Sequence, residues 1–339
     1  MRAPGFWRRG GARLPGLLLS PLGWVWQTGA ALKRMGVRPR TAPRPVVCVG
    51  NLTAGGAGKT PTVMLIASWF RDRGVTPGVL LRGYGGSLSG SMPVPVDPAT
   101  HTAAEVGDEA LLHSRLAPTV ICTARVAGAE ALAAHCDVIL MDDGHQNFAL
   151  IKDLSIVVAD AVDGFGNGRI LPAGPLRESI AAGLGRANAL IAIGDGMPDP
   201  RIKRASLPVL RGRLVPSDDA ERLSGRRVLG FSGIGRPQKF RDTLEQLGAE
   251  ITGFEAFADH HPYTAAEVDR LKQAAAHSRA ELVTTAKDAV RLTPDMRDGV
   301  GVVDIRLALD QPDMLDRLLD PVLAAVSKRG SGGAPTSTS

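Results

Sequence analysis

The sequence has no acidic residue before Asp72, although it contains 34 Asp and Glu in all. The first 71 positions carry 11 Lys and Arg, whereas the rest of the chain carries 29 basic residues against its 34 acids. The formal net charge of +6 therefore comes from the N-terminal segment alone. A basic protein often binds nucleic acid, but the body of this chain is mildly acidic, and we expect no nucleic-acid partner.

Cysteine is also scarce. The three cysteines, Cys48, Cys122 and Cys136, are odd in number, lack C-x-x-C spacing and lie in or near apolar segments. This pattern excludes a disulfide framework and a cysteine-rich zinc site. We expect three reduced core residues in a cytosolic compartment.

Charge of either sign is missing from residues 14–32, and basic residues flank the stretch on both sides. Trp7, Trp24 and Trp26 lie in or near it. Its 19 uncharged residues fall just short of the roughly 20 apolar residues that span a bilayer, and prolines and glycines interrupt them. We therefore expect residues 1–36 to lie in a membrane interface. A single span, a secretory signal peptide and a core helix are the alternatives.

What the sequence does contain is a phosphate-binding pattern. The apolar run 46–50 enters a glycine-rich turn that ends in Gly58-Lys59-Thr60, and a helical pattern follows over residues 61–70. Backbone N–H groups and a helix N-terminus would face an anion, Lys59 would reach the terminal phosphates, and Thr60 would ligate Mg²⁺. The nucleotide-binding residues expected are Asn51, Thr53, Gly55, Gly56, Ala57, Gly58, Lys59 and Thr60.

One position departs from the strict pattern, because Thr53 stands where the first glycine belongs. A glycine-rich turn that binds nothing is the alternative. The order of strand, glycines, Lys-Thr and helix disfavours it.

Strands alternate with helices along the rest of the chain, which predicts parallel sheets covered on both faces. The strands expected first are 77–81, 119–122, 138–141 and 154–159; a second set is 189–193, 227–231, 251–256, 282–285 and 302–305. We therefore expect an α/β fold of two Rossmann-like doubly wound domains. The expected divisions are an N-terminal segment 1–36, a nucleotide-binding domain 37–180, a second domain 181–327 and a disordered tail 328–339.

Several acids fall where ligands collect in such sheets, at the carboxyl ends of strands. Asp142 and Asp143 end an apolar strand, as a Walker B acid does, and Asp142 would hold Mg²⁺. Asp108 and Glu109 begin a helix. They are either dipole-compensating acids or a general base and a metal ligand for phosphoryl transfer.

The loop Asp259-His260-His261 carries two adjacent histidines. No further His at a suitable spacing completes a zinc site, so we expect one of them to orient a catalytic carboxylate. Arg125, Arg177 and Glu178 either bind an anionic substrate or form surface ion pairs.

Taken together, these motifs resemble tetraacyldisaccharide 4′-kinase, the lipid A 4′-kinase family. The resemblance spans nearly all of residues 1–325, and Ser or Thr is usual in that family at the position of Thr53. The motifs that carry it are Gly50-Asn51-Leu52-Thr53, Gly58-Lys59-Thr60-Pro61, Arg82-Gly83-Tyr84, Val106-Gly107-Asp108-Glu109, Asp142-Asp143-Gly144, Leu171-Pro172-Ala173-Gly174-Pro175-Leu176-Arg177-Glu178, Gly233-Ile234-Gly235-Arg236-Pro237-Gln238, Asp259-His260-His261 and Lys287-Asp288-Ala289-Val290.

The resemblance implies an ATP- and Mg²⁺-dependent kinase at the cytoplasmic face of the Gram-negative inner membrane. Its substrate would be the 4′-hydroxyl of a tetraacylated glucosamine disaccharide 1-phosphate, and it would act as a monomer. Asp108 would be the base, assisted by His260 or His261. The metal ligands implied are Thr60, Glu109 and Asp142; the residues near the reaction or the substrate are Asp143, Arg82, Arg125, Asn147, Arg177 and Glu178.

The sequence departs from the family at one motif. The family usually reads Asp-Asp-Gly-Phe-Gln-His, whereas this chain has His145 at the fourth position and Asn147 at the sixth. An acid–base role at position 147 is thereby in doubt. A rival hypothesis is a membrane-associated GTPase or ATPase switch, although Thr285-Ala286-Lys287-Asp288 places Lys and Asp side by side instead of matching [NT]-K-x-D. A purely structural membrane protein would leave the phosphate loop unexplained.

Overall fold

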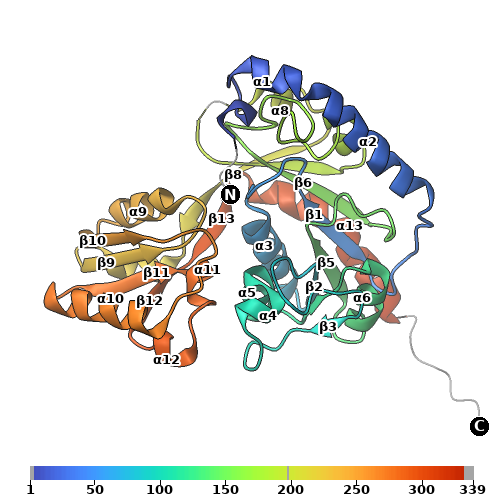
Figure 1. Ribbon diagram of the computed structural model, residues 1–339. Coiled ribbons are helices and arrows are strands. Elements are labelled where there is room, and N and C mark those ends of the chain that lie inside the picture. The colour runs from blue at the N-terminus through green and yellow to red at the C-terminus, as the bar shows by residue number, and fades with distance from the viewer. Residues whose placement is uncertain (1–3, 197, 332–339) are drawn as a thin grey trace, which may run out of the picture.

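The computed structural model describes residues 4–196 and 198–331, which form two sheets flanked by helices (Figure 1). The larger sheet has nine strands in the order β13-β8-β7-β6-β1-β5-β2-β4-β3. Only β3 and β13, at its two edges, run antiparallel to their neighbours. Its strands are β1 (Val46–Gly50), β2 (Pro77–Leu81), β3 (Val94–Pro95), β4 (Thr119–Ile121), β5 (Val138–Asp142), β6 (Leu154–Asp160), β7 (Ala189–Ile193), β8 (Val209–Pro216) and β13 (Ile305–Leu309).

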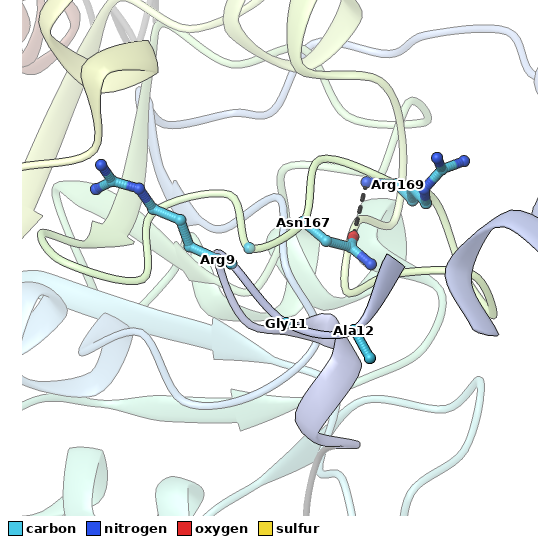
Figure 2. A pocket seen from close by; sticks show the side chains of 7 residues that line it. Arg9, Gly11, Ala12, Asn167 and Arg169 are labelled. Atoms are coloured by element: carbon cyan, nitrogen blue, oxygen red, sulfur yellow. Dashed lines mark hydrogen bonds between the residues drawn. The ribbon is translucent and has the colours of Figure 1, made fainter. Parts of the chain in front are cut away.

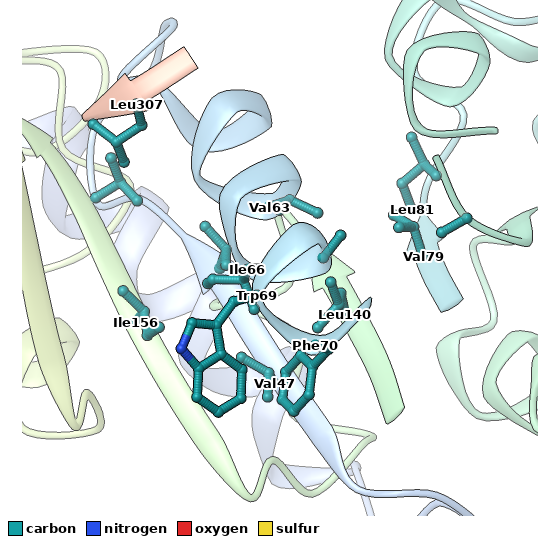
Figure 3. Close-up of a cluster of buried hydrophobic side chains, with 14 of the residues drawn as sticks. Val47, Val63, Ile66, Trp69, Phe70, Val79, Leu81, Leu140, Ile156 and Leu307 are labelled. Carbon is teal, nitrogen blue, oxygen red and sulfur yellow. The ribbon is translucent and has the colours of Figure 1, made fainter. Parts of the chain in front are cut away.

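The central strands are buried on both faces, as parallel sheets require. Val47 and Val49 of β1 face a core shared with α3 (Lys59–Arg71), which Figure 3 shows around Trp69 and Phe70. The intervening Val46 and Cys48 face the opposite core, beside α6 (Arg125–Leu132). Helix α13 (Pro312–Ser331) joins the α3 side through Leu315, Leu319 and Val322. The α/β class expected from the sequence is confirmed.

The smaller sheet has four parallel strands in the order β10-β9-β11-β12. These are β9 (Arg227–Ser232), β10 (Glu250–Ala256), β11 (Glu281–Thr285) and β12 (Val300–Val303). Helices α9 (Pro237–Gln246) and α10 (Ala265–His277) pack in separate cores on its two sides. The remaining helices are α4 (Ala103–Val106), α5 (Asp108–Ser114), α7 (Ile180–Leu184), α8 (Pro200–Lys203), η2 (Asp218–Leu223), α11 (Ala286–Ala289) and α12 (Pro294–Arg297).

The expected division at residue 181 falls inside the nine-stranded sheet. Strand β7 was expected in the second set but pairs in parallel with β6, and the chain returns after β12 to place β13 against β8. The smaller sheet is therefore an insertion between β8 and β13. Local apolar patterns identify a strand but not its neighbours, so the sequence could not show where β7 joins.

The N-terminal segment consists of η1 (Gly5–Trp7), α1 (Arg13–Leu18) and α2 (Ser20–Met35), which lie along the outside of the larger unit (Figure 1). Among the described residues, no helix is long and apolar enough to cross a membrane. The exposed large apolar side chains of this segment are Leu14, Leu17, Leu18, Leu22, Trp24, Val25, Trp26, Leu32 and Met35.

The three cysteines are free and buried, as expected for core residues. The predicted tail 328–339 is wrong at its start, because α13 continues through residues 328–331. The rest of that predicted tail, residues 332–339, lies outside the described residues.

Candidate active site

The phosphate loop follows β1 and ends at the first turn of α3. The buried amide of Asn51 donates to the carbonyls of Thr53 (2.7 Å) and Gly55 (3.1 Å), which fixes the start of the loop. Gly58 precedes the helix with φ near +87°, a conformation that favours glycine. No side-chain cap satisfies the first-turn N–H groups of this helix in the described structure, so they are free to bind an anion.

Lys59 lies at the mouth of this loop beside a carboxylate. Its Nζ is 3.7 Å from Asp143 Oδ1, and Arg177 donates to the same oxygen at 2.8 Å. Asp143 has φ near +51°, a conformation that is uncommon outside glycine. Two cations therefore converge on one half-buried acid at the mouth of the phosphate loop.

Asp142 ends β5 and is buried. His113 Nε2 lies 2.9 Å from its Oδ2, whereas Oδ1 is buried and has no hydrogen-bond partner among the described residues. Burial disfavours the charged form, yet the hydrogen bond from His113 and the nearby Lys59 keep the pKa of Asp142 below its ordinary value. Asp142 is an ionised acid with one unsatisfied oxygen.

Glu109 connects the phosphate loop to the smaller sheet. The Thr60 hydroxyl donates to Glu109 Oε1 at 3.2 Å, and Lys287 from α11 lies 3.4 Å from the same oxygen. Within residues 4–196 and 198–331, no three His, Cys, Asp or Glu side chains converge as a metal cage. Magnesium does not need one, because it keeps several waters and uses one or two carboxylates with phosphate oxygens. Thr60, Glu109 and the free oxygen of Asp142 fit that donor set.

Asp108 and His260 meet although 152 residues separate them. His260 Nδ1 donates to Asp108 Oδ2 at 2.8 Å, and Arg291 donates to the same oxygen through Nη2 (2.6 Å) and Nε (2.9 Å). Burial opposes ionisation of Asp108, but these donors hold its pKa below the ordinary value. In turn, the hydrogen bond to Asp108 raises the pKa of His260.

His261 has a different environment from its neighbour. Its Nε2 lies 3.1 Å from both carboxylate oxygens of Glu267, and its ring stacks on Phe257 with centroids 4.7 Å apart. Glu267 also closes the capping box of α10 with Thr264. These contacts fix the start of α10, and the contact with Asp108 belongs to His260.

Asp288 belongs to the segment 285–288, which comes near a guanine-reading motif in sequence. The carboxylate is fully buried and accepts hydrogen bonds from five groups, so it is turned into the protein instead of toward a ligand. Its donors are Ser232 Oγ, the Gly233 N–H, Tyr263 Oη, Thr285 Oγ1 and Arg291 Nη1. The sequence did not identify Arg291 as a site residue, because its partners Asp108 and Asp288 lie in different parts of the fold.

Comparison with known proteins shows which family the chain belongs to. A family model described as Tetraacyldisaccharide-1-P 4′-kinase matches residues 16–324. A protein named tetraacyldisaccharide 4′-kinase from Rhodospirillum centenum is 50% identical over 97% of this chain and 99% of its own length.

The chain belongs to the tetraacyldisaccharide 4′-kinase family.

This confirms the resemblance seen in the motifs, and with it the expected activity, a tetraacyldisaccharide 4′-kinase of lipid A biosynthesis. A second relative of the same name, from Rhodospirillum rubrum, is 48% identical over 95% of the chain and 98% of its own length. A crystal structure of LpxK from Aquifex aeolicus in complex with ATP superposes with a TM-score of 0.72 at 24% identity, covering 91% of this chain and 99% of that one. It shares the fold.

The remaining residues implied by the tetraacyldisaccharide 4′-kinase resemblance differ in solvent exposure and in their hydrogen-bond partners. Arg82 is exposed, whereas Arg125 is buried, donates to the Cys122 carbonyl at 2.5 Å and has its pKa lowered by burial. Glu178 accepts two bonds from Arg186 and one from Gln146 (3.0 Å). Asn147 Oδ1 accepts the N–H groups of residues 149 and 150, so that oxygen caps its own turn.

Two tryptophans of the N-terminal segment donate hydrogen bonds to the backbone of residues 172–177. Trp26 Nε1 donates to the Arg177 carbonyl at 3.2 Å, and Trp7 Nε1 donates to the Pro172 carbonyl at 3.1 Å. A cavity of about 410 Å³ lies between residues 9–12 and the segment 166–169, with the guanidinium groups of Arg9 and Arg169 on opposite sides (Figure 2). No residue of the phosphate loop lines it.

Proposed function

We propose that the chain transfers the γ-phosphoryl group of ATP to the 4′-hydroxyl of a tetraacylated glucosamine disaccharide 1-phosphate. The observation that carries the proposal is the Asp108–His260 hydrogen bond beside a phosphate loop. Asp108 adjoins Glu109, which bonds Thr60 of that loop. An acid–base pair and a phosphate cradle are thereby brought together by one turn of α5, as transfer to an alcohol requires.

Within the pair, His260 is the better proton acceptor. Asp108 is nearly buried and already accepts three hydrogen bonds on Oδ2, whereas the His260 side chain is 62% exposed. Because Nδ1 donates its hydrogen to Asp108, Nε2 of the neutral ring carries a lone pair, and it lies 3.9 Å from Asp259 Oδ1. The 4′-hydroxyl gives its proton to Nε2 as its oxygen bonds to the γ-phosphorus, and the bond to the ADP oxygen breaks. Asp108 orients the ring and stabilises the imidazolium.

The phosphate loop binds the nucleotide through the α3 N-terminus and Lys59. Thr60, Glu109 and Asp142 would hold Mg²⁺, which when bound neutralises charge on the β- and γ-phosphates. Asp143, Arg82, Arg125, Asn147, Arg177 and Glu178 remain the proposed contacts to the acceptor or the reacting groups. Arg177 is favoured by its contact with Asp143 beside Lys59.

The N-terminal segment supports a location at the cytoplasmic face of the inner membrane of a Gram-negative bacterium. Its exposed Leu and Trp side chains form an apolar surface on helices whose sequence carries Lys and Arg but no acid. Apolar burial and attraction to anionic lipids together bind such a segment to an interface.

The activity is tested by incubating the protein with γ-labelled ATP or GTP, with and without the disaccharide 1-phosphate in detergent micelles. We expect label on the glycolipid from ATP, and its loss in His260→Ala. Glu267→Gln, which alters the partner of His261 instead, is the matched control and should keep most of the activity. If the protein hydrolyses GTP at a rate that does not depend on the glycolipid, the switch hypothesis is favoured and the proposal is overturned.

A further inference from the structure

Helix α5 contributes to three parts of the phosphate site. Its first residues, Asp108 and Glu109, contact His260 and Thr60. His113 follows four residues after Glu109, so both side chains lie on the same face of the helix. On that face, His113 reaches the acid at the end of β5, Asp142.

The contact between His113 and Asp142 is buried and directional. Nε2 lies 2.9 Å from Oδ2, and the two side chains are only 1% and 2% exposed. An ionised carboxylate can only accept, so the hydrogen is on the histidine. A charge-assisted bond shielded from water holds the carboxylate in one orientation more firmly than a surface contact would.

This contact makes the two oxygens of Asp142 unequal. Oδ2 is occupied by His113, whereas Oδ1 is just as enclosed and has no partner among the described residues. A buried acceptor left without a hydrogen bond is unfavourable, because it has lost its hydration without gaining a partner. Asp142 stands at the carboxyl end of β5, next to β1, which leads into the phosphate loop. The unsatisfied oxygen is therefore available at the edge of the sheet where the nucleotide is proposed to bind.

We infer that His113 is a positioning residue for the magnesium site: by holding Oδ2, it keeps Oδ1 available to Mg²⁺ or to a water of its shell. The inference rests on the proposed use of Mg·ATP. Groups that hydrogen-bond a metal-binding carboxylate typically change metal affinity 10–100-fold when removed. His113 thus acts on the metal through Asp142 without touching the nucleotide.

The test measures binding instead of turnover. ATP affinity of the full chain is determined by calorimetry in EDTA and over a series of Mg²⁺ concentrations. In His113→Leu, we expect the Mg²⁺ concentration that gives half-maximal tightening of ATP binding to rise about 10–100-fold, with the affinity in EDTA unchanged. His113→Gln, whose amide can still donate, should recover part of the loss.

Leu112→Ala is the matched control, because it removes a buried side chain of the same helix without removing a donor. It should leave the Mg²⁺ dependence unchanged. The inference would be overturned if His113→Leu folds and keeps the wild-type Mg²⁺ dependence, or if it loses ATP affinity equally in EDTA and in Mg²⁺. Either result would leave the proposed function standing. If ATP binding by the wild type does not depend on Mg²⁺, both the inference and the proposed use of Mg²⁺ are overturned.

A measurement on the wild type covers the case in which His113→Leu does not fold. The ¹⁵N resonance of His113 Nε2 is followed while Mg²⁺ is added to the ADP complex. A shift that saturates with the metal supports the inference, and an unchanged resonance contradicts it.

Discussion

At the scale of single residues, the site depends on which of two neighbouring histidines meets Asp108. We expect His260→Ala and Asp108→Asn each to lower kcat about 10²–10⁴-fold, the range of general-base catalysis. Because both act on one proton transfer, the double variant should lose little more than the worse single variant. Steady-state kinetics at saturating ATP measures this.

The same kinetics separates the alternatives for Asp108. Independent, multiplying losses would contradict a shared role for the pair. A loss confined to Mg²⁺ affinity would instead make Asp108 a metal ligand.

His145, which replaces the usual aromatic ring of the family motif, gives a prediction for stability. It is buried, and burial lowers the pKa of its ring to about 4, while its nitrogens contact Ser155 and the Gly183 carbonyl. Between pH 6.5 and 4, His145 is therefore protonated in the unfolded chain but stays neutral in the native state. Stability falls as the pH falls through that window, by roughly 3 kcal/mol for a shift of this size.

His145→Phe should flatten the dependence of unfolding free energy on pH between pH 7.5 and 4.5. It also removes two hydrogen bonds, so we expect lower stability at pH 7.5. Denaturant titrations across the range measure both effects. His135→Gln, at an exposed position, should keep the wild-type slope; an equally steep slope in His145→Phe would contradict the assignment.

At the scale of elements, α11 and the residues after it join the two sheets. Arg291 is buried and bridges Asp108 of α5 and Asp288 beside β11. Removing one partner of a buried ion pair typically costs about 3–5 kcal/mol. We expect Arg291→Met to destabilise the protein on that scale, and Arg291→Lys to fold but to lose kcat, because an ammonium cannot bridge both acids.

Thermal unfolding and kinetics are measured on both Arg291 variants. Arg270→Lys is the control, since Arg270 pairs with Glu255 on the surface. If Arg291→Met matches the wild type in stability and kcat, the buried bridge does not support the site.

The N-terminal helices give a prediction for membrane binding. Leu18 and Trp24 are 72% and 74% exposed, so replacing both with Ser removes apolar surface without breaking the bonds made by Trp7 and Trp26. We expect the double variant to sediment less with anionic vesicles and to bind ATP as the wild type does. Equal sedimentation would show that another surface binds the membrane.

At the scale of the whole molecule, the sequence predicted what is local. The strand, glycine turn and helix around Lys59 are contiguous, and so is the acid after β5. The sequence could not predict contacts that need the insertion of the smaller sheet: the choice of His260 over His261, the bridge through Arg291, and the return of the chain to pair β13 with β8. Each depends on residues far apart in the chain meeting at one edge.

The hydrogen bond from Trp26 to the Arg177 carbonyl ties the exposed apolar side chains of the N-terminal helices to the backbone of a residue whose side chain bonds Asp143 beside Lys59. An enzyme seated on the lipid layer through those side chains would hold its phosphate loop at a fixed height above the acyl chains. It would then meet its next acceptor by lateral diffusion, without returning to bulk solution. Its velocity would follow the mole fraction of acceptor in the layer, and diluting the layer with inert lipid would slow it at constant total acceptor.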